Sequence, residues 1–234
     1  MLTLTGLKKS FGAKKAVDIP AFIINDGDFL GLVGNNGAGK TTLFRLIVDL
    51  LMPDDGEILI NDINPAKSEQ WKHFTGTFLE DGFLIDFLTP EEYFSFVGKI
   101  NELTNEQMDK AMQMLMPLMG EEILNQRKLI RDFSAGNKQK IGIVAALLHH
   151  PSLVILDEPF NFLDPSSQIT LKNTLINYNK DTGATILISS HNLQHVTDIC
   201  TRIALMEEGN ILKDLANLRG NAKKELEDYF LLRP

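Results

Sequence analysis

The sequence predicts an α/β fold with a parallel sheet at its core, an antiparallel β subdomain at the N-terminus and an inserted α-helical subdomain. Four apolar runs are nearly continuous, as expected of parallel strands covered by helices on both faces. These runs are Phe29–Val33, Leu153–Leu156, Ile186–Ser189 and Ile203–Met206. Helical patterns lie between or after them, which indicates parallel strands joined by helices. Residues 89–150 carry helical patterns throughout, so we expect the inserted subdomain there.

Length and composition limit the class of protein. The 234 residues fit one domain, which we divide into a β subdomain with the parallel core (1–88 and 151–234) and a helical subdomain (89–150). No run approaches 18 apolar residues and the N-terminus lacks the apolar segment of a secretory signal, so we expect a cytoplasmic chain. A net charge of −8 without a basic block argues against nucleic acid as a partner. We expect the single cysteine, Cys200, to be a packed apolar residue.

The N-terminal part differs in pattern from the four apolar runs. The first thirty residues and Gly56–Ile60 alternate more between polar and apolar side chains, and a turn signal, Pro53-Asp54-Asp55-Gly56, stands between them. Such patterns are typical of antiparallel strands joined by tight turns. We therefore predict a small antiparallel sheet in this part of the chain.

Two helix starts are visible in the sequence. Thr89-Pro90-Glu91-Glu92 combines an N-capping threonine with proline at the first helical position and glutamate at the third. Asp164-Pro165 is a second such start, and it predicts a helix through Asn177. A methionine stripe follows the first start, at Met108, Met112, Met116 and Met119. We interpret it as core of the helical subdomain, with an adaptable partner-binding face as the alternative.

The segment Gly34–Thr41 predicts a phosphate-binding loop. It reads Gly34-Asn35-Asn36-Gly37-Ala38-Gly39-Lys40-Thr41, which fits G-x-x-x-x-G-K-S/T, between a strand and an apolar helix over Thr42–Leu51. Its glycines let backbone N–H groups approach phosphates, and the start of the helix favours negative charge. Lys40 is expected to reach the β- and γ-phosphates, and the Thr41 hydroxyl is expected to bind Mg²⁺.

Two acids and a histidine follow other predicted strands. Asp157 and Glu158 end the run Leu153–Leu156, and His191 follows Ile186–Ser189. Ligands of parallel sheets bind beyond the carboxyl ends of strands. We expect Asp157 to hold Mg²⁺, Glu158 to polarise the attacking water, and His191 to sense the γ-phosphate. The alternatives are a pair of helix-capping acids and a histidine without a role.

A further segment before the Asp157 strand carries a family resemblance. Phe133-Ser134-Ala135-Gly136-Asn137-Lys138-Gln139-Lys140 is similar to the signature sequence LSGGQxQR of the ATP-binding cassette (ABC) ATPases. The chain resembles this family over essentially its whole length. The resemblance implies a P-loop NTPase (RecA-like) fold and ATP hydrolysis with Mg²⁺. It also implies a head-to-tail dimer in which Ser134 and Gly136 of one subunit contact the γ-phosphate held by the Lys40 loop of the other.

The resemblance assigns roles to further positions. Phe11 corresponds to the aromatic residue that stacks on adenine, and Glu80 stands where the family usually has a glutamine near the metal. Asn161–Asp164 resembles the loop that passes information across the dimer. The implied catalytic residues are Glu158, His191, Lys40 and Glu80, and the implied metal ligands are Thr41, Glu80 and Asp157. The implied nucleotide-binding residues are Phe11, Gly34, Asn35, Asn36, Gly37, Ala38, Gly39, Lys40, Thr41, Thr42, Ser134, Ala135, Gly136 and Asp164.

Several residues depart from the family pattern. Ala135 and Asn137 replace a glycine and a glutamine of the signature, and Lys140 replaces its arginine. Alanine takes a positive φ only at a cost, but it needs little space, so we expect the γ-phosphate contact to be kept. Glu80 adds negative charge, and Phe162 is bulky where the family usually has a small residue. Because Lys40, Asp157, Glu158 and His191 are present, we expect hydrolysis to be retained.

The resemblance also implies a membrane partner. ABC ATPases without membrane segments usually serve a separate transmembrane permease, which would place this chain on the cytoplasmic face of the membrane. The apolar stretch Gly82–Leu88 predicts a groove for a cytoplasmic helix of that partner, unless it packs the helical subdomain. The tail, Leu226–Leu232, resembles cassettes of the ABC-2 exporter group. The alternatives are a soluble ABC ATPase, such as a SUF-like assembly ATPase, and a module that binds ATP without hydrolysis.

Overall fold

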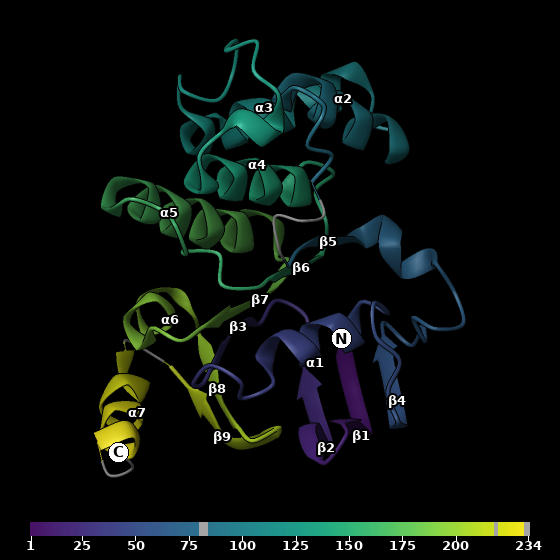
Figure 1. Cartoon of the computed structure of the whole chain (residues 1–234), viewed down its shortest axis with the longest axis vertical. Helices are drawn as coiled ribbons and strands as arrows, with labels where there is room; N and C mark the ends of the chain where they lie inside the picture. Colours follow the sequence, from purple (N-terminus) through teal and green to yellow (C-terminus); the bar gives the residue numbers. More distant parts are fainter. Residues whose placement is uncertain (80–83, 218–219, 232–234) are drawn as a thin grey trace. The chain divides into compact units, whose positions relative to one another are not determined.

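The computed structural model describes residues 1–79, 84–217 and 220–231 (Figure 1). The chain forms two compact units, one of Met1–Trp71 with Thr185–Pro234 and one of Lys72–Ala184. A 3₁₀ helix, η1 (Gln70–Phe74), lies where the chain passes from the first unit to the second. The predicted subdomain boundaries at residues 88 and 151 stay a prediction.

The first unit contains the predicted antiparallel sheet. Its strands are β1 (Leu2–Phe11), β2 (Lys14–Ile24) and β4 (Asp55–Ile60), in the order β2-β1-β4. Both pairs are antiparallel, and Leu2, Leu4 and Leu7 of β1 are buried. Asp54 joins the turn before β4 to β1, because its carboxylate accepts hydrogen bonds from Lys9 Nζ at 2.8 Å and from the Ser10 amide at 2.7 Å.

A second group of strands in this unit is mostly parallel. β7 (Thr185–Ser190), β3 (Phe29–Val33) and β8 (Arg202–Glu207) are parallel neighbours in that order, and β9 (Asn210–Ala216) pairs antiparallel with β8. The predicted strands at these three parallel positions are confirmed. The helices of this unit are α1 (Lys40–Ile47), α6 (Leu193–Ile199) and α7 (Ala222–Leu231).

Helix α6 packs closely on β3, at a glycine. A Cβ atom added at Gly31 would lie 1.8 Å from the side chain of Val196 and 3.0 Å from the sulfur of Cys200. Cys200 is buried there, as predicted, and burial raises the pKa of its thiol. Its role is therefore packing.

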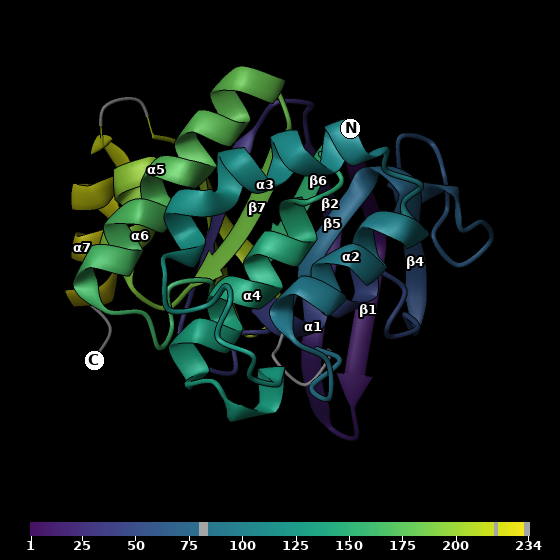
Figure 2. The same ribbon diagram turned by 90° about the horizontal axis from the view of Figure 1, so that it is seen from above.

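In the described part of the second unit, two strands combine with four α-helices. β5 (Thr75–Phe78) and β6 (Leu153–Leu156) pair in parallel, with Thr75 opposite Leu153 and Phe78 opposite Leu156. The helices are α2 (Pro90–Ile100), α3 (Asn105–Met119), α4 (Ala135–Leu147) and α5 (Pro165–Thr182), and a 3₁₀ turn, η3 (Ile130–Asp132), precedes α4. Helix α4 contacts both strands and α3 (Figure 2).

Two glycines bring α4 against β5. A Cβ atom at Gly142 would lie 2.1 Å from the ring of Phe78, and one at Gly76 would lie 1.9 Å from the carbonyl oxygen of Ala146. Both distances are far shorter than any real carbon contact. At each contact, the element that carries the glycine therefore presents only its backbone to the other element.

The two predicted capped helix starts agree with the structure, whereas the end of α5 and both ends of α1 do not. The predicted capping box of α2 is confirmed by hydrogen bonds between Thr89 and Glu92 at 2.9 and 3.3 Å. Asp164 caps α5 as predicted, yet α5 continues past Asn177 to Thr182, since buried Tyr178 anchors the extra turn by donating to the Pro151 carbonyl at 2.9 Å.

Helix α1 and the methionine stripe also differ from expectation. Helix α1 covers Lys40–Ile47 instead of Thr42–Leu51, because Asp49 has a φ of 55° and ends the regular backbone. The core interpretation of the stripe holds for Met119, which is buried, and is wrong for Met116, which is exposed. The buried face of α3 consists of Ala111, Leu115, Leu118 and Met119. None of the helices in the described ranges combines the length and the apolar character needed to cross a bilayer.

Candidate nucleotide site

The phosphate loop joins the end of β3 to the start of α1, and its glycines are required by close contacts. A Cβ atom at Gly34 would lie 2.2 Å from the Met206 carbonyl oxygen. Gly39 caps α1 with a φ of 111°, and a Cβ atom there would lie 2.1 Å from the Ala16 carbonyl oxygen. Only glycine fits both positions. The loop is thereby fixed between β2 and β8 with its amides at the start of a helix.

The charge in this loop comes from Lys40. Its side chain is 6% exposed, and its Nζ donates to the Gly34 carbonyl at 2.7 Å and to the Asn35 carbonyl at 3.4 Å. The first turn of α1 contains no acidic residue, so the positive end of the helix dipole is not offset locally. A buried ammonium group and a helix N-terminus together favour an anion at the loop.

The hairpin between β1 and β2 places a cation beside this loop, opposite an exposed aromatic residue of β1. Phe11, the predicted adenine-stacking residue, is 53% exposed and is the register partner of Lys14. The Nζ of Lys14 lies 3.4 Å from where a Cβ atom of Gly37 would stand. Within the described ranges Lys14 forms no ion pair, whereas its neighbour Lys15 pairs with Asp18 at 2.8 Å. Lys14 is not among the residues predicted from the sequence, and the sequence signal that points to it is the two-residue turn after Phe11.

His191 directly follows β7, the strand that pairs with β3, and β3 leads into the phosphate loop. Its predecessor Ser190 is the register partner of Val33, the last residue before the loop, in the parallel pair β3–β7. His191 is exposed at this edge. The predicted location at the carboxyl end of a strand is confirmed, and its role stays a prediction.

The second unit holds the two predicted carboxylates. Asp157 follows β6 and is buried, and its amide donates to the Phe78 carbonyl at 2.9 Å. Glu158 is half-buried and has a left-handed φ of 47°. Because Phe78 and Leu156 are register partners, the chain after β5 leaves beside Asp157. Glu80, predicted two residues after Phe78, lies outside the described residues.

The signature segment forms the start of α4. Ser134 is the N-cap and accepts a hydrogen bond from the Asn137 amide at 3.3 Å. Ala135 is the first helical residue, so the alanine needs no left-handed backbone. Gly136 is where space is short, since a Cβ atom there would lie 2.6 Å from the Phe162 carbonyl oxygen. Lys140, which stands where the family has an arginine, is buried and pairs with Glu122 at 2.8 Å.

The loop before α5 presents one aromatic side chain to solvent. Phe162 is 74% exposed and has a φ of 63°. This left-handed backbone conformation is energetically unfavourable for any residue that has a Cβ atom. Asp164 is engaged as the cap of α5, with amide hydrogen bonds at 2.9 and 3.0 Å. The hydroxyl of Ser166, followed by that of Ser167, holds the pKa of this carboxyl well below its usual range. Nucleotide binding by Asp164 stays a prediction.

The structure thus gathers the candidate residues into two groups. The first unit contains Phe11, Lys14, the loop 34–41 with Thr42, and His191. The second unit contains Ser134–Gly136, Asp157, Glu158 and Asp164. Among the residues with described positions, no three histidine, cysteine or acidic side chains cluster to hold a metal.

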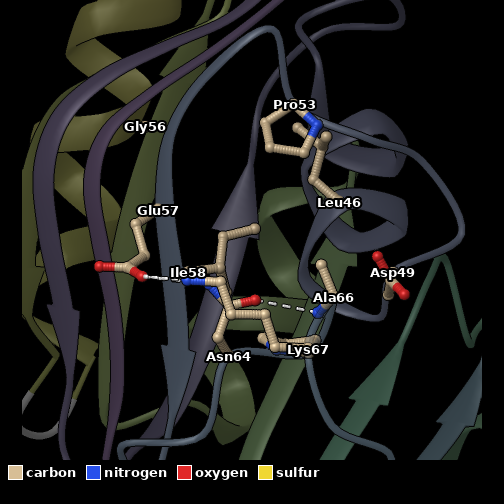
Figure 3. A pocket seen from close by; sticks show the side chains of 10 residues that line it. Leu46, Asp49, Pro53, Gly56, Glu57, Ile58, Asn64, Ala66 and Lys67 are labelled. Atoms are coloured by element: carbon tan, nitrogen blue, oxygen red, sulfur yellow. Dashed lines mark hydrogen bonds and ion pairs between the residues drawn. The ribbon is translucent and has the colours of Figure 1, made fainter.

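A surface pocket of about 260 Å³ lies at the other end of α1 from Lys40 (Figure 3). Its wall includes Leu46, Pro53 and Ile58, and its polar groups largely satisfy one another. Asn64 donates to Glu57 at 3.1 Å and accepts from the Ala66 amide at 3.0 Å. The phosphate loop does not line this pocket, so it is separate from the candidate nucleotide site.

Comparison with known proteins adds family information to this geometry. The family described as ABC transporter matches residues 17–161. The bacitracin transport ATP-binding protein BcrA of Bacillus licheniformis is 33% identical over 231 residues, 97% of this chain and 74% of that protein. The linearmycin resistance ATP-binding protein LnrL of Bacillus subtilis (strain 168) is 33% identical over 213 residues, 91% of this chain and 68% of that protein.

Solved structures share the fold. The ATP-binding subunit of an ABC transporter superposes with a TM-score of 0.84 at 29% identity, over 100% of this chain and 94% of that chain. A dimeric ATP-binding cassette bound to ADP and phosphate superposes with a TM-score of 0.82 at 21% identity, over 93% of this chain and 99% of that chain. The predicted fold class, with its N-terminal antiparallel sheet and P-loop NTPase core, is confirmed.

Proposed function

Because this chain belongs to the ABC transporter family, we propose that it drives export through a separate transmembrane subunit and that its phosphate loop and Glu158 are the centre of ATP hydrolysis. The chain is an ATP-binding subunit of an ABC transporter and an ATPase. The observation that supports the proposed site most strongly is the phosphate loop, where Gly34 and Gly39 are sterically required and Lys40 is buried. Export is supported by the bacitracin and linearmycin relatives.

The proposed mechanism is phosphoryl transfer from ATP to water. The loop amides and Lys40 bind the phosphate oxygens, and Lys40 exchanges its bond to the Gly34 carbonyl for a γ-phosphate oxygen. Glu158 orients the attacking water and accepts its proton as the new oxygen–phosphorus bond forms. The bond from the γ-phosphorus to the bridging oxygen breaks in the same step, and ADP leaves with that oxygen. His191 donates a hydrogen bond to the γ-phosphate. Preorganised charges supply most of the stabilisation in such reactions.

Two of the proposed metal ligands each carry a donor atom of the kind that magnesium prefers. The hydroxyl of Thr41 and the carboxylate of Asp157 are hard oxygen ligands, and one or two protein ligands with phosphate oxygens are usual for Mg²⁺. When bound, this ion neutralises charge on the phosphates. The chain's own part is to hold the Thr41 hydroxyl at the first turn of α1 and the Asp157 carboxylate directly after β6.

The signature helix supports a dimer as the working form. Dimeric cassettes are seen in the family, and here the N-terminus of α4 starts with a serine cap and two small residues. A helix start of this kind suits an anion. We expect Ser134 and Gly136 of one copy to meet the γ-phosphate held by the loop of a second copy.

The transmembrane partner is expected to bind near the segment after β5. Phe87 is 66% exposed, and Leu84 and Ile85 are half-buried, so apolar surface is present in this segment. Phe83 lies outside the described residues. Exposed aromatic side chains are common anchors in protein interfaces. This position supports the predicted groove for a cytoplasmic helix.

Purification of the tagged chain from native membranes in mild detergent tests the proposal. Recovery of a polytopic membrane protein in comparable amount is expected, and the variant Phe87→Asp is expected to lose it. Recovery of soluble partners alone, with the chain absent from membranes, would contradict the proposal and favour a soluble assembly ATPase. Direction is tested in liposomes that contain the purified complex with the chain on the outside, with labelled bacitracin as the probe because a relative is a bacitracin transport ATP-binding protein. Accumulation of the probe in the lumen on addition of external MgATP would support export.

A further inference from the structure

The backbone at Glu158 adopts a conformation that its surroundings must hold. Its φ of 47° is left-handed, and such a φ is unfavourable for a non-glycine residue relative to ordinary backbone. The direction of the Cα–Cβ bond, and so of the carboxylate, depends on this φ. A residue that fixes the backbone here therefore also fixes where the carboxylate points.

The fixing contact comes from helix α4. Gln139 Nε2 donates a hydrogen bond of 3.1 Å to the carbonyl oxygen of Glu158, and the side chain of Gln139 is only 6% exposed. The same oxygen accepts from the Asn161 amide at 3.1 Å. One carbonyl thus receives one bond from its own turn and one from a separate helix. Two bonds at one oxygen restrict the rotation of the peptide that follows Glu158.

A second contact joins the same helix to the same loop. Gly136 lies one helical turn before Gln139. Its Cα packs against the Phe162 carbonyl, and a Cβ atom at Gly136 would lie only 2.6 Å from that carbonyl oxygen. Helix α4 therefore contacts both ends of the turn from Glu158 to Phe162. The first turn of the helix and this turn are expected to move together.

We propose that Gln139 is a positioning residue for ATP hydrolysis, which holds the left-handed turn at Glu158 and links the carboxylate to the signature helix. This inference rests on the proposed role of Glu158. In a dimer of the proposed kind, a displacement of α4 by the nucleotide of the other copy would reach Glu158 through the Gln139 hydrogen bond.

The test compares the steady-state ATPase of the full chain and of Gln139→Met, which keeps the size of the side chain and removes the donor. We expect kcat to fall about 10- to 100-fold, as for a misplaced catalytic group, while the KM for MgATP and the affinity for a fluorescent ATP analogue stay within about 2-fold. The matched control is Gln168→Met. Gln168 donates to the Leu163 carbonyl of the same loop at 3.1 Å but not to Glu158, so its kcat should stay near that of the parent chain.

Gln139→Glu separates positioning from packing. As a carboxylate this side chain repels the Glu158 carbonyl, and as a protonated acid it can donate to that oxygen again. Burial raises the pKa of such a carboxyl group. The ratio of its kcat to that of the parent chain should therefore rise as the pH falls from 8 to 6. A purely structural role predicts a ratio that does not change with pH, and this readout remains decisive if Gln139→Met fails to fold.

Two further results have distinct meanings. A Gln139→Met chain that is folded and has the parent kcat would overturn the inference, provided that Glu158→Gln is inactive. If Glu158→Gln itself keeps the parent kcat, the proposed function of Glu158 fails, and the inference about Gln139 fails with it.

Discussion

Ser190 and Val33 are register partners in the parallel pair β7–β3, so His191 and the phosphate loop leave the sheet from adjacent strand ends. This arrangement predicts that His191→Ala loses a γ-phosphate contact made during hydrolysis. We expect kcat to fall about 100-fold or more, as for the loss of one stabilising donor, with little change in ADP affinity. Single-turnover phosphate release measures the effect. An unchanged rate would leave His191 without a catalytic role.

Lys14 is predicted to strengthen nucleotide binding through its charge. Its ammonium lies over Gly37 and is exposed, so the contribution should be modest and salt-dependent. Lys14→Ala should weaken ATP binding about 2- to 5-fold at low salt and less at high salt. Lys15→Ala is the control, since Lys15 pairs with Asp18. Equal effects of both variants in calorimetric titrations would show that only net charge matters.

The left-handed backbone of Phe162 is predicted to lower the free energy of unfolding of the chain. Glycine adopts a φ of 63° without a steric cost, although it loses more entropy on folding. Phe162→Gly should therefore raise the free energy of unfolding by about 0.5–1 kcal/mol. Phe162→Ala keeps a Cβ atom and should change it little. Urea denaturation distinguishes the two, and an equal gain for alanine would assign the cost to the exposed ring instead.

His149 is predicted to make the chain sensitive to mild acid. Burial lowers the pKa of its ring below 6.5, and within the described part of the chain neither ring nitrogen has a hydrogen-bond partner. Between the lowered pKa and 6.5 the unfolded state binds more protons than the folded state. The free energy of unfolding should therefore fall as the pH drops through 6.5, and level off below the lowered pKa.

The test of this prediction is the pH dependence of denaturation. His149→Leu should flatten the loss of stability between pH 7 and 5, whereas His73→Gln, at an exposed position, serves as the control for removing a histidine. A slope that is the same in the His149→Leu chain would show that other groups cause the acid sensitivity.

The sequence predicted the buried strands well and the remaining strands poorly. The runs at β3, β6, β7 and β8 are continuous and apolar because both faces are covered. β5 reads Thr-Gly-Thr-Phe and was missed, since its glycine serves contact with α4 instead of strand propensity. β9 is an edge strand in which half-buried and exposed residues alternate, and the sequence did not predict it either. Helix ends depended on tertiary contacts such as that of Tyr178.

For the candidate site, the sequence predicted the motifs but not the contacts between them. The phosphate loop, the two acids after β6 and the capping Ser134 are all local patterns. Such patterns can be recognised from neighbouring residues in the sequence. The bond from Gln139 to Glu158 joins residues on a helix and on a strand end, and it exists only because α4 packs on β5 and β6. Lys14 likewise acquires its position from the register of the β1–β2 hairpin.

The glycines that bring α4 against β5 also bear on how this chain tolerates mutation. At Gly76 and Gly142 even one methyl group would push the helix away from the strand, and with it the signature residues at its start. Neither position has polar chemistry of its own. Random mutagenesis selected for lost transport should therefore recover alanine substitutions at these two positions as well as changes in the phosphate loop, and such variants are expected to bind nucleotide at the Lys40 loop still.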